Sequence, residues 1–277
     1  MPTIRAACER LPLVHNQLVL QETPEGKGPS VNGTVSTATD LDIAKVQLAA
    51  AFRAAAMYGF AEGIDNHFSL AVPGIPGHFL MNRFGPHWAE IQPRDLLTID
   101  TDGRLVAGEG EWERSAFLIH RAAHLTSPDA GCVLHTHMPY ATAVSMTECG
   151  LDTQISQTAM MFHGRHARLP FGGIADDEDE GLRIASALKD GTSVVMLDGH
   201  GVLAVGNSVA DAWYKLYFLE RACEAQVLAM STGSPLVRVS ARTAAQTAIQ
   251  WDEAGNPDAL FAAVCRRLDR KDSVPQS

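Results

Sequence analysis

Short apolar segments alternate with longer amphipathic segments through the middle of this chain, and this alternation restricts the folds open to it. The longer segments repeat apolar residues with a helical period and predict helices at 41–58, 113–125, 176–188 and 208–231. The short segments predict strands at 67–72, 79–81, 96–100 and 132–137, and a strand–turn–strand unit at 193–206. Because mixed helices and strands bury their apolar faces against each other, we expect a three-layer α/β/α domain or an α+β domain.

The chain has 277 residues, which is enough for one large domain with a substantial core. We expect this domain at 40–235, preceded by an N-terminal arm at 1–39 and followed by a C-terminal extension at 236–277. Residues 22–39 are rich in Gly, Pro, Ser and Thr, which predicts a flexible segment. The preceding stretch 11–20 is apolar, so we expect it to dock on the domain or on a neighbouring subunit.

The charge pattern excludes several classes of partner. The net charge is −10 and no run of Lys or Arg offers a surface for phosphates, so we expect no nucleic-acid partner. No apolar run is long enough to cross a membrane, and the charged N-terminus does not fit a signal peptide. Five scattered cysteines without a CxxC pair are typical of reduced thiols. Together these features predict a cytoplasmic protein.

Three histidines predict a metal site. His135 and His137 close an apolar strand, and alternation in a strand places residues i and i+2 on one face, with Cβ atoms about 6–7 Å apart. Imidazoles at that spacing can converge on one ion. His200 stands between Gly199 and Gly201, which let the backbone turn sharply and bring a ligand close. Nitrogen ligands of this kind suit zinc, and also iron(II), manganese or cobalt.

These motifs resemble those of the class II aldolase/adducin family. The matching stretches are AEIQPRDLLTIDTDGRLVAG (89–108), SPDAGCVLHTHMPYATAVS (127–145) and VVMLDGHGVLAVGNSVADAWYKLYFLERACEAQVLA (194–229). The HTH element with an HG about sixty residues later is a specific combination, and the resemblance covers roughly 40–235. It implies a zinc-type site made by the three histidines and an α/β/α fold with a mixed, largely antiparallel sheet. It also implies a homotetramer with active sites at subunit interfaces.

The chain departs from the sugar-phosphate aldolases of this family. Those enzymes hold phosphate with a Gly-Asn-x-Ser strand start and a Ser-Ser pair before a catalytic acid. Here His67 stands where that Asn would be, the Ser-Ser-Glu element is missing, and Ala116 occupies the ungapped position of the acid. Glu113, one helical turn earlier, is the candidate acid or base, with Glu111 nearby, although both fit solvated residues at a helix start. The chain therefore resembles the adducin-like and decarboxylase-like members more closely.

A loop with a guanidinium and an aromatic ring replaces the phosphate loop. We expect its residues to bind substrate together with His67; they are Asn82, Arg83, Phe84 and Gly85. Arg83 could pair with a substrate carboxylate, and Phe84 or Trp88 could flank a planar ring. The alternative is a surface arginine whose aromatic neighbours lie in the core.

Several further ionisable residues stand out. His163 is a candidate proton carrier or substrate contact because its unperturbed pKa lies near neutrality, and His166 is a weaker one. His120 and His124, four residues apart on the helix at 113–125, are expected to be structurally satisfied or to support the metal ligands. Glu220 interrupts the apolar stripe of the helix at 208–231, which predicts a structural salt bridge rather than a functional acid.

These residues favour a metal-dependent carbon–carbon lyase, an aldolase or decarboxylase. The substrate would be a small non-phosphorylated hydroxy, keto or aromatic carboxylic acid. Two alternatives stay open. An iron(II) ion at the same ligands would suit a non-heme oxygenase on the aldolase-like scaffold, and an adducin-like head would be a non-catalytic interaction module.

Overall fold

The structure, a computed structural model, describes residues 37–173, 178–189 and 191–272. Within these residues eight strands form one sheet in the order β4-β3-β2-β1-β5-β8-β7-β6. The strands are β1 (His67–Ala71), β2 (His78–Asn82), β3 (Leu96–Asp100), β4 (Leu105–Ala107), β5 (Cys132–Thr136), β6 (His166–Leu169), β7 (Val194–Leu197) and β8 (Gly201–Gly206). Neighbouring strands are antiparallel except β6 and β7, which are parallel. The sheet is therefore mixed and largely antiparallel, as the resemblance implies.

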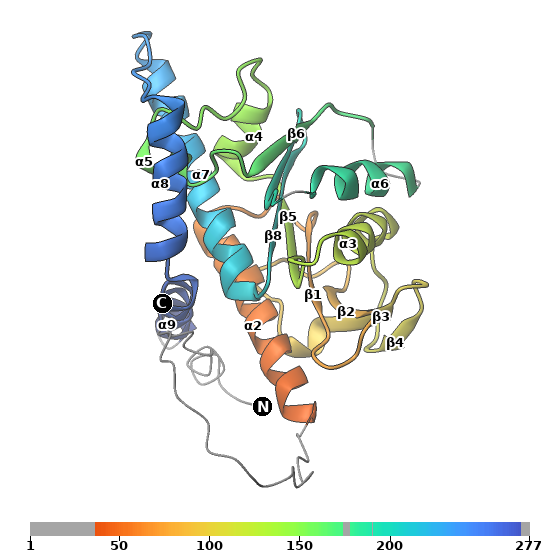
Figure 1. The fold of residues 1–277 in the computed structure, drawn as a ribbon. Helices are drawn as coiled ribbons and strands as arrows, with labels where there is room; N and C mark the ends of the chain where they lie inside the picture. The colour runs from red at the N-terminus through yellow and green to blue at the C-terminus, as the bar shows by residue number, and fades with distance from the viewer. Residues whose placement is uncertain (1–36, 174–177, 190, 273–277) are drawn as a thin grey trace, which may run out of the picture.

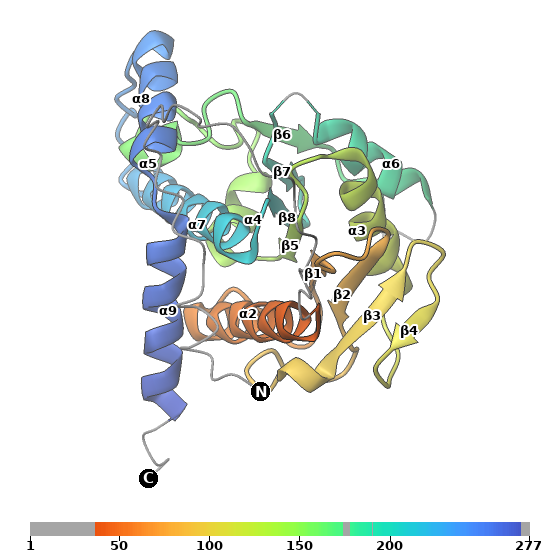
Figure 2. The same ribbon diagram turned by 60° about the horizontal axis from the view of Figure 1, so that its bottom comes forward.

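Helices cover both faces of this sheet (Figures 1 and 2). They are α2 (Thr37–Tyr58), α3 (Arg114–Thr126), α4 (Pro139–Ser145), α5 (Gln157–Met160), α6 (Glu178–Ala187), α7 (Val209–Ser231), α8 (Ala241–Ala254) and α9 (Pro257–Asp272), with a 3₁₀ turn at Pro93–Asp95. Helices α3 and α6 lie against one face, whereas α2, α4 and α7 lie against the other. This arrangement confirms the three-layer α/β/α fold.

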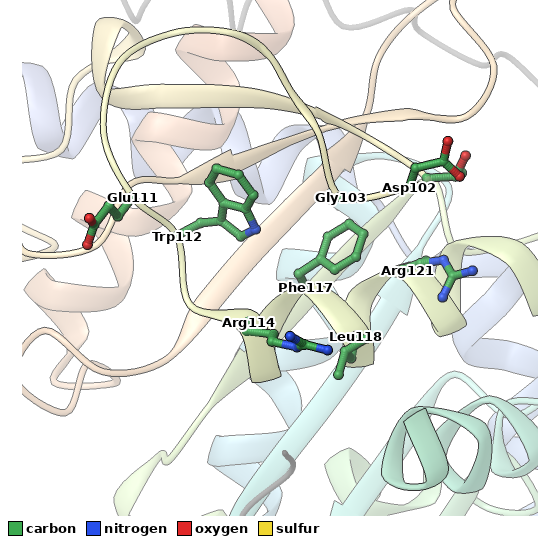
Figure 3. Close-up of a pocket in the computed structure, with 9 residues that line it drawn as sticks. Asp102, Gly103, Glu111, Trp112, Arg114, Phe117, Leu118 and Arg121 are labelled. Carbon is green, nitrogen blue, oxygen red and sulfur yellow. The ribbon is translucent and has the colours of Figure 1, made fainter. Parts of the chain in front are cut away.

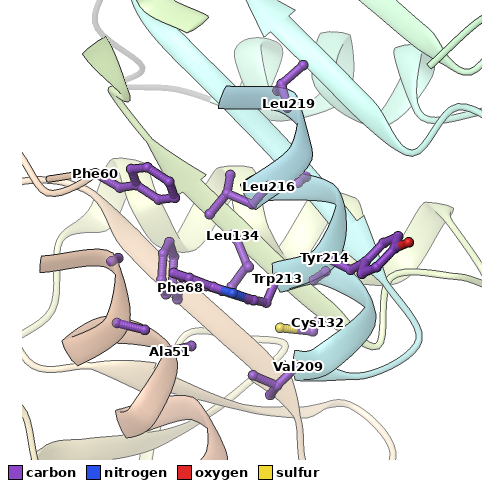
Figure 4. Packing of buried hydrophobic residues seen from close by; sticks show 14 of the residues in the cluster. Ala51, Phe60, Phe68, Cys132, Leu134, Val209, Trp213, Tyr214, Leu216 and Leu219 are labelled. Carbon is purple, nitrogen blue, oxygen red and sulfur yellow. The ribbon is translucent and has the colours of Figure 1, made fainter. Parts of the chain in front are cut away.

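Alternation along the central strand β5 divides the core into two layers. Leu134 points into the layer shared with α2 and α7, while Val133 points to the α3 and α6 side. In the first layer Trp213 of α7 packs among Phe60, Phe68 and Leu134 (Figure 4). Burial of such large side chains stabilises the fold by about 1.5–3 kcal/mol each. Alternation also places His135 on the α3 side of the sheet, two residues after Val133.

The structure adds elements that the pattern of apolar residues did not predict. Strand β4 has three residues, all exposed, and β6 is a short edge strand with only partial burial, so neither carries a clear period. Beyond 236, α9 buries Phe261, Val264 and Leu268 in the core shared by α2 and α7. Part of the predicted C-terminal extension thus shares the core of the domain. The predicted arm lies outside the described residues except for 37–39, which begin α2.

The described residues bear on two expectations, that the cysteines are reduced and that no segment crosses a membrane. Cys132, Cys149 and Cys223 are free thiols, as expected. Cys265 takes part in a disulfide bond, so the expectation of a fully reduced set is wrong for this residue. Among the described helices, none has both the length and the apolar character that crossing a bilayer requires.

Candidate metal centre

The fold brings the three predicted ligands to one edge of the sheet. His135 lies near the end of β5, His137 follows the last residue of that strand, and His200 occupies the turn between β7 and β8. Because Thr136 of β5 pairs with Val202 of β8, the turn that carries His200 sits beside the end of β5. One ligand atom from each histidine lies within 4.8 Å of the others, a grouping that could hold a metal ion.

Hydrogen bonds orient two of these imidazoles for metal binding. His135 Nδ1 lies 3.0 Å from the carbonyl oxygen of Val202, and a carbonyl can only accept, so Nδ1 is the protonated nitrogen. His137 Nδ1 is paired with the carboxylate of Glu62. In both rings Nε2 is left with its lone pair, and Nε2 of His137 is buried without any hydrogen-bond partner among the described residues. A carboxylate or carbonyl behind a histidine is the usual support of a metal ligand.

Burial keeps the imidazoles of His135 and His200 neutral, which metal binding requires. Burial, followed by the neighbouring histidines, lowers the pKa of His135 well below its ordinary value. Burial, with a smaller contribution from His137, lowers the pKa of His200 to about 4. Both rings therefore present unprotonated nitrogen at neutral pH.

Gly201 is necessary for the close approach of these ligands. A Cβ at this position would lie 2.6 Å from Cδ2 of His137 and 2.8 Å from the carbonyl oxygen of Thr136. Such distances are not tolerated between nonbonded atoms, so any side chain would push the His137 ring away. Gly199 has a φ of +63°, the left-handed region that glycine adopts without strain. As the motif predicts, Gly199 lets the backbone turn through its positive φ, and Gly201 lets the chain approach His137 closely.

Two buried polar residues hold the backbone around His137. Asn66 has a φ of +79°, and its Oδ1 accepts a hydrogen bond of 3.3 Å from the backbone N–H of His137. The carboxylate of Glu220 accepts hydrogen bonds from the backbone N–H groups of Tyr140 and Ala141, at 2.9 and 2.8 Å. The main contacts of Glu220 are therefore these two backbone hydrogen bonds at the start of α4, and not the salt bridge that the sequence predicts.

The histidines open into a cavity of about 320 Å³. It is lined by Asp65, Asn66, His67, Glu113, Ser115, Ile119, His135, His137, Phe171, Gly173 and His200. Glu113 thus faces the same cavity as the three histidines, and its carboxylate accepts a hydrogen bond of 2.7 Å from Ser115. The described residues of this lining include no Lys or Arg, so the cavity wall offers no fixed cation of its own.

His67 forms the inner wall of the cavity. It pairs with His135 across β1 and β5, and the two rings stack with centroids 4.7 Å apart. Its Nδ1 lies 2.7 Å from Nε2 of His120 on α3. Burial, together with His120 and two of the candidate ligands, lowers the pKa of His67 well below its ordinary value.

Comparison with known proteins identifies the fold around this site. A family model described as Class II Aldolase and Adducin N-terminal domain matches residues 46–227. The chain belongs to the class II aldolase and adducin family. An aldolase class 2 protein of Caulobacter vibrioides is 36% identical over 191 residues, which cover 69% of this chain and 74% of that protein. Alpha-adducin of Rattus norvegicus is 34% identical over 196 residues, 69% of this chain and 26% of adducin.

Solved structures agree with this assignment to the class II aldolases. An aldolase II superfamily protein from Pseudomonas syringae is 36% identical, with a TM-score of 0.79, and the match covers 86% of this chain and 98% of that one. An L-fuculose 1-phosphate aldolase from Glaciozyma antarctica is 25% identical, with a TM-score of 0.73 and coverage of 88% and 96%.

The loop predicted to bind substrate in this class II aldolase domain is only partly at the site. Asn82 and Phe84 line a small hollow that also touches His67 and Glu113. Arg83 and Gly85 line a different hollow, and the guanidinium of Arg83 is paired with Asp95 at 3.0 Å. Within this chain Arg83 lies outside the lining of the histidine cavity, because the carboxylate of Asp95 holds its guanidinium. Its contact with a substrate carboxylate stays a prediction.

The structure also separates His163 and His166 from the cavity. His163 Nδ1 is hydrogen-bonded to Thr153, and His166 Nδ1 to the carbonyl of Phe162. His166 pairs with Val194 at the start of β7, three residues before Leu197, so the start of β6 lies about 10 Å from the end that carries His200. Neither histidine lines the cavity, and the proton-carrier role predicted for His163 is not supported by this placement.

A larger hollow of about 670 Å³ lies on the other side of the α3 N-terminus (Figure 3). Its walls carry two arginines and an aromatic pair from α3 and the segment before it: Arg114, Arg121, Trp112 and Phe117. The carboxylates of Asp102 and Glu111 share the same hollow, so its charge is mixed. This hollow is larger than the cavity of the histidines, but none of the candidate metal ligands lines it. We therefore do not take it as the candidate metal centre. Glu111 belongs here, whereas Glu113 faces the histidines.

Sequence reasoning missed Glu62, Ser69 and Phe171. Glu62 lies in the turn before β1, and Phe171 follows β6, so only the folded chain brings them beside His137 and His200. Ser69 lies at a buried strand position that the sequence pattern does not distinguish from other core positions. A period or motif search has no signal for any of them.

Proposed function

We propose that this protein is a metal-dependent lyase that cleaves a carbon–carbon bond of a small, non-phosphorylated hydroxy, keto or aromatic carboxylic acid. One observation carries the proposal. Three histidines from β5, its end and the β7–β8 turn converge, and Nε2 of His137 is buried with no hydrogen-bond partner in the described part of the chain. A buried lone pair left unmatched costs free energy unless something binds it, and a divalent transition metal would do so.

The proposed ligands are His135, His137 and His200, with zinc as the first choice and iron(II), manganese or cobalt as other possibilities. A divalent metal bound there supplies Lewis acidity toward a substrate oxygen. The residues around it are given complementary tasks. Asn66, whose buried Nδ2 has no hydrogen-bond partner within the described ranges, donates a hydrogen bond to a substrate oxygen. Glu113 holds or moves a proton at the reacting carbon or oxygen, since it faces the same cavity.

The cavity wall favours a non-phosphorylated substrate. Asp65 and Glu113 place two carboxylates on it, and its described residues include no Lys or Arg. A phosphate dianion would meet this negative wall with only the metal to balance it, whereas one carboxylate or hydroxyl needs much less compensation. Phe171, an exposed residue of the cavity lining with its ring 6.4 Å from that of His200, offers a surface for an aromatic ring. His67, Asn82 and Phe84 complete the proposed substrate contacts.

The test is metal content and turnover in His137→Ala. We expect the wild-type protein to bind about one equivalent of metal per chain and to cleave or decarboxylate a member of a panel of hydroxy, keto and aromatic acids. His137→Ala should lose both properties, because one ligand of three is removed. His87→Ala is the matched control, since His87 is an exposed histidine outside the cavity. Full activity in a metal-free His137→Ala protein would refute the proposal.

A non-catalytic interaction module is the second candidate, favoured by the 34% identity to alpha-adducin. A protein that binds no metal and turns over no acid in the panel would support it over a lyase. The iron(II) oxygenase remains an outcome of the same test. Iron in the purified protein and oxygen uptake with a candidate acid would replace the lyase by an oxygenase.

We further propose a cytoplasmic homotetramer whose active sites lie at subunit interfaces. Phe171, a large apolar side chain of the cavity lining that is exposed in the single chain, suits such an interface. Light scattering coupled to gel filtration should give four times the 29.8 kDa mass of the chain. A monomer with full activity would exclude interfacial sites.

A further inference from the structure

A chain of hydrogen bonds runs from the cavity wall into the layer between the sheet and α3. His67 Nδ1 lies 2.7 Å from His120 Nε2, and His120 Nδ1 lies 2.5 Å from Ser69 Oγ. The same Ser69 Oγ lies 2.7 Å from His124 Nε2, and His124 Nδ1 lies 2.5 Å from the carbonyl oxygen of Ala130. We call these four side chains, His67, His120, Ser69 and His124, the histidine relay.

The carbonyl at the inner end sets the direction of every bond in the histidine relay. Ala130 O can only accept, so His124 Nδ1 carries a proton and, in a neutral ring, His124 Nε2 accepts. Ser69 then donates its only proton to His124 and must accept from His120 Nδ1. That leaves His120 Nε2 as the acceptor of a proton carried by Nδ1 of His67.

Burial supports the neutral rings that this direction needs. His120 and Ser69 are fully buried, and an imidazolium there would have no carboxylate partner in the histidine relay. Burial lowers the pKa of His124 to about 4, and burial with the neighbouring histidines lowers the pKa of His120 well below its ordinary value.

We propose that the histidine relay locks His67 in the Nδ1–H tautomer, so that its Nε2 lone pair is presented to the cavity as an acceptor for a substrate hydroxyl or a bound water. Nε2 is the ring nitrogen directed away from His120, and His67 lines the cavity beside His135. The neutral side chain of a solvated histidine favours the opposite, Nε2–H tautomer, which would present a donor instead. His120, Ser69 and His124 are thus positioning residues that act through His67.

The role of the lone pair in turnover rests on the proposed function, but the tautomer itself does not. We would record tautomer-specific nitrogen chemical shifts of ¹⁵N-histidine-labelled, metal-free protein at neutral pH, with His67→Gln, His120→Gln and His124→Gln for assignment. We expect an unprotonated Nε2 and a protonated Nδ1 in His67, His120 and His124 alike. An Nε2–H tautomer at His67 in the wild-type protein overturns the proposal.

Ser69→Ala tests the link between the serine and His67. Removing the hydroxyl leaves His120 Nδ1 without an acceptor, so we expect His67 to become a mixture of tautomers and kcat to fall about tenfold. Metal content should stay at the wild-type level, since none of the three proposed ligands is altered. Ser69→Thr, which keeps a hydroxyl, should restore the wild-type tautomer, and Ser127→Ala, a buried serine outside the relay, should leave it unchanged. An unchanged His67 tautomer in a folded Ser69→Ala protein overturns the link.

The two proposals fail separately. Wild-type tautomers as expected in a protein that binds no metal would refute the lyase and leave the histidine relay standing. Reversed tautomers in an active metalloenzyme would refute only the relay.

Discussion

Replacing Glu220 by Gln tests how the buried carboxylate supports the candidate metal centre. Glu220 is 1% exposed and accepts two backbone N–H groups at the start of α4, at 2.9 and 2.8 Å. Helix α4 begins two residues after His137, so these bonds fix the chain that follows this candidate metal ligand. Glutamine keeps the size of the side chain but has one acceptor oxygen where the carboxylate has two.

The expected loss of stability follows from these two bonds. One N–H keeps an acceptor, whereas the other faces the NH₂ group of glutamine, and an unsatisfied buried donor costs about 1–3 kcal/mol. The remaining bond loses its charge assistance, worth about 1 kcal/mol. Part of this is offset because glutamine buries no charge, and burial is the main influence that raises the pKa of Glu220. We expect a net loss of about 2–3 kcal/mol in the free energy of unfolding.

Urea unfolding of metal-free protein at neutral pH measures this loss, and metal titration measures the consequence at the site. Glu224→Gln is the matched control, one turn along α7, where the carboxylate forms a partly exposed ion pair of 2.7 Å with Arg221. Such pairs contribute about 0–1 kcal/mol, so this variant should remain close to wild type. Equal losses in the two variants, or a loss below about 1 kcal/mol in Glu220→Gln, would refute the reasoning. We also expect weaker metal binding in Glu220→Gln alone.

Two further predictions concern Gly201 beside His137 and His124 on α3. Gly201→Ala should weaken metal binding about 10–100-fold in a titration, because its Cβ would displace the His137 ring. Gly181→Ala is the control, because its Cβ would lie 2.9 Å from the carbonyl oxygen of Leu118, far from the candidate ligands. It should lower stability without weakening metal binding. Equal metal affinities in the two variants would contradict the argument. For pH, burial lowers the pKa of His124 from its ordinary value of 6.5 to about 4 in the folded protein, so the unfolded chain binds more protons below pH 6.5. The free energy of unfolding should therefore fall as the pH drops from about 6.5 to about 4, and His124 should account for about 3 kcal/mol of this fall. The fall should be smaller by that amount in His124→Gln. Parallel curves of unfolding free energy against pH for the two proteins would show that His124 is not buried in its neutral form.

Local patterns in the sequence were sufficient to predict most helices and strands and to propose three candidate ligands, while the family resemblance singled out the α/β/α fold and strengthened the case for those ligands. The period of apolar residues distinguishes the helices α2, α3 and α7 from the strands, because burial on one face imposes 3.6 or 2 residues per repeat. His135 and His137 follow from strand alternation, and His200 from its flanking glycines. Each signal spans only a few residues of the chain, so no knowledge of the fold is needed to detect it.

Tertiary structure alone decided which other side chains share the site. Glu62 reaches His137 and Glu220 reaches the start of α4 from segments about 75 to 80 residues away in the chain. Arg83 fits a carboxylate-binding loop in the sequence, yet in the fold Asp95 already occupies its guanidinium. His120 and His124 show only a helical spacing in the sequence. Their link to His67 arises because α3 packs over β1, where Ser69 can join the two rings.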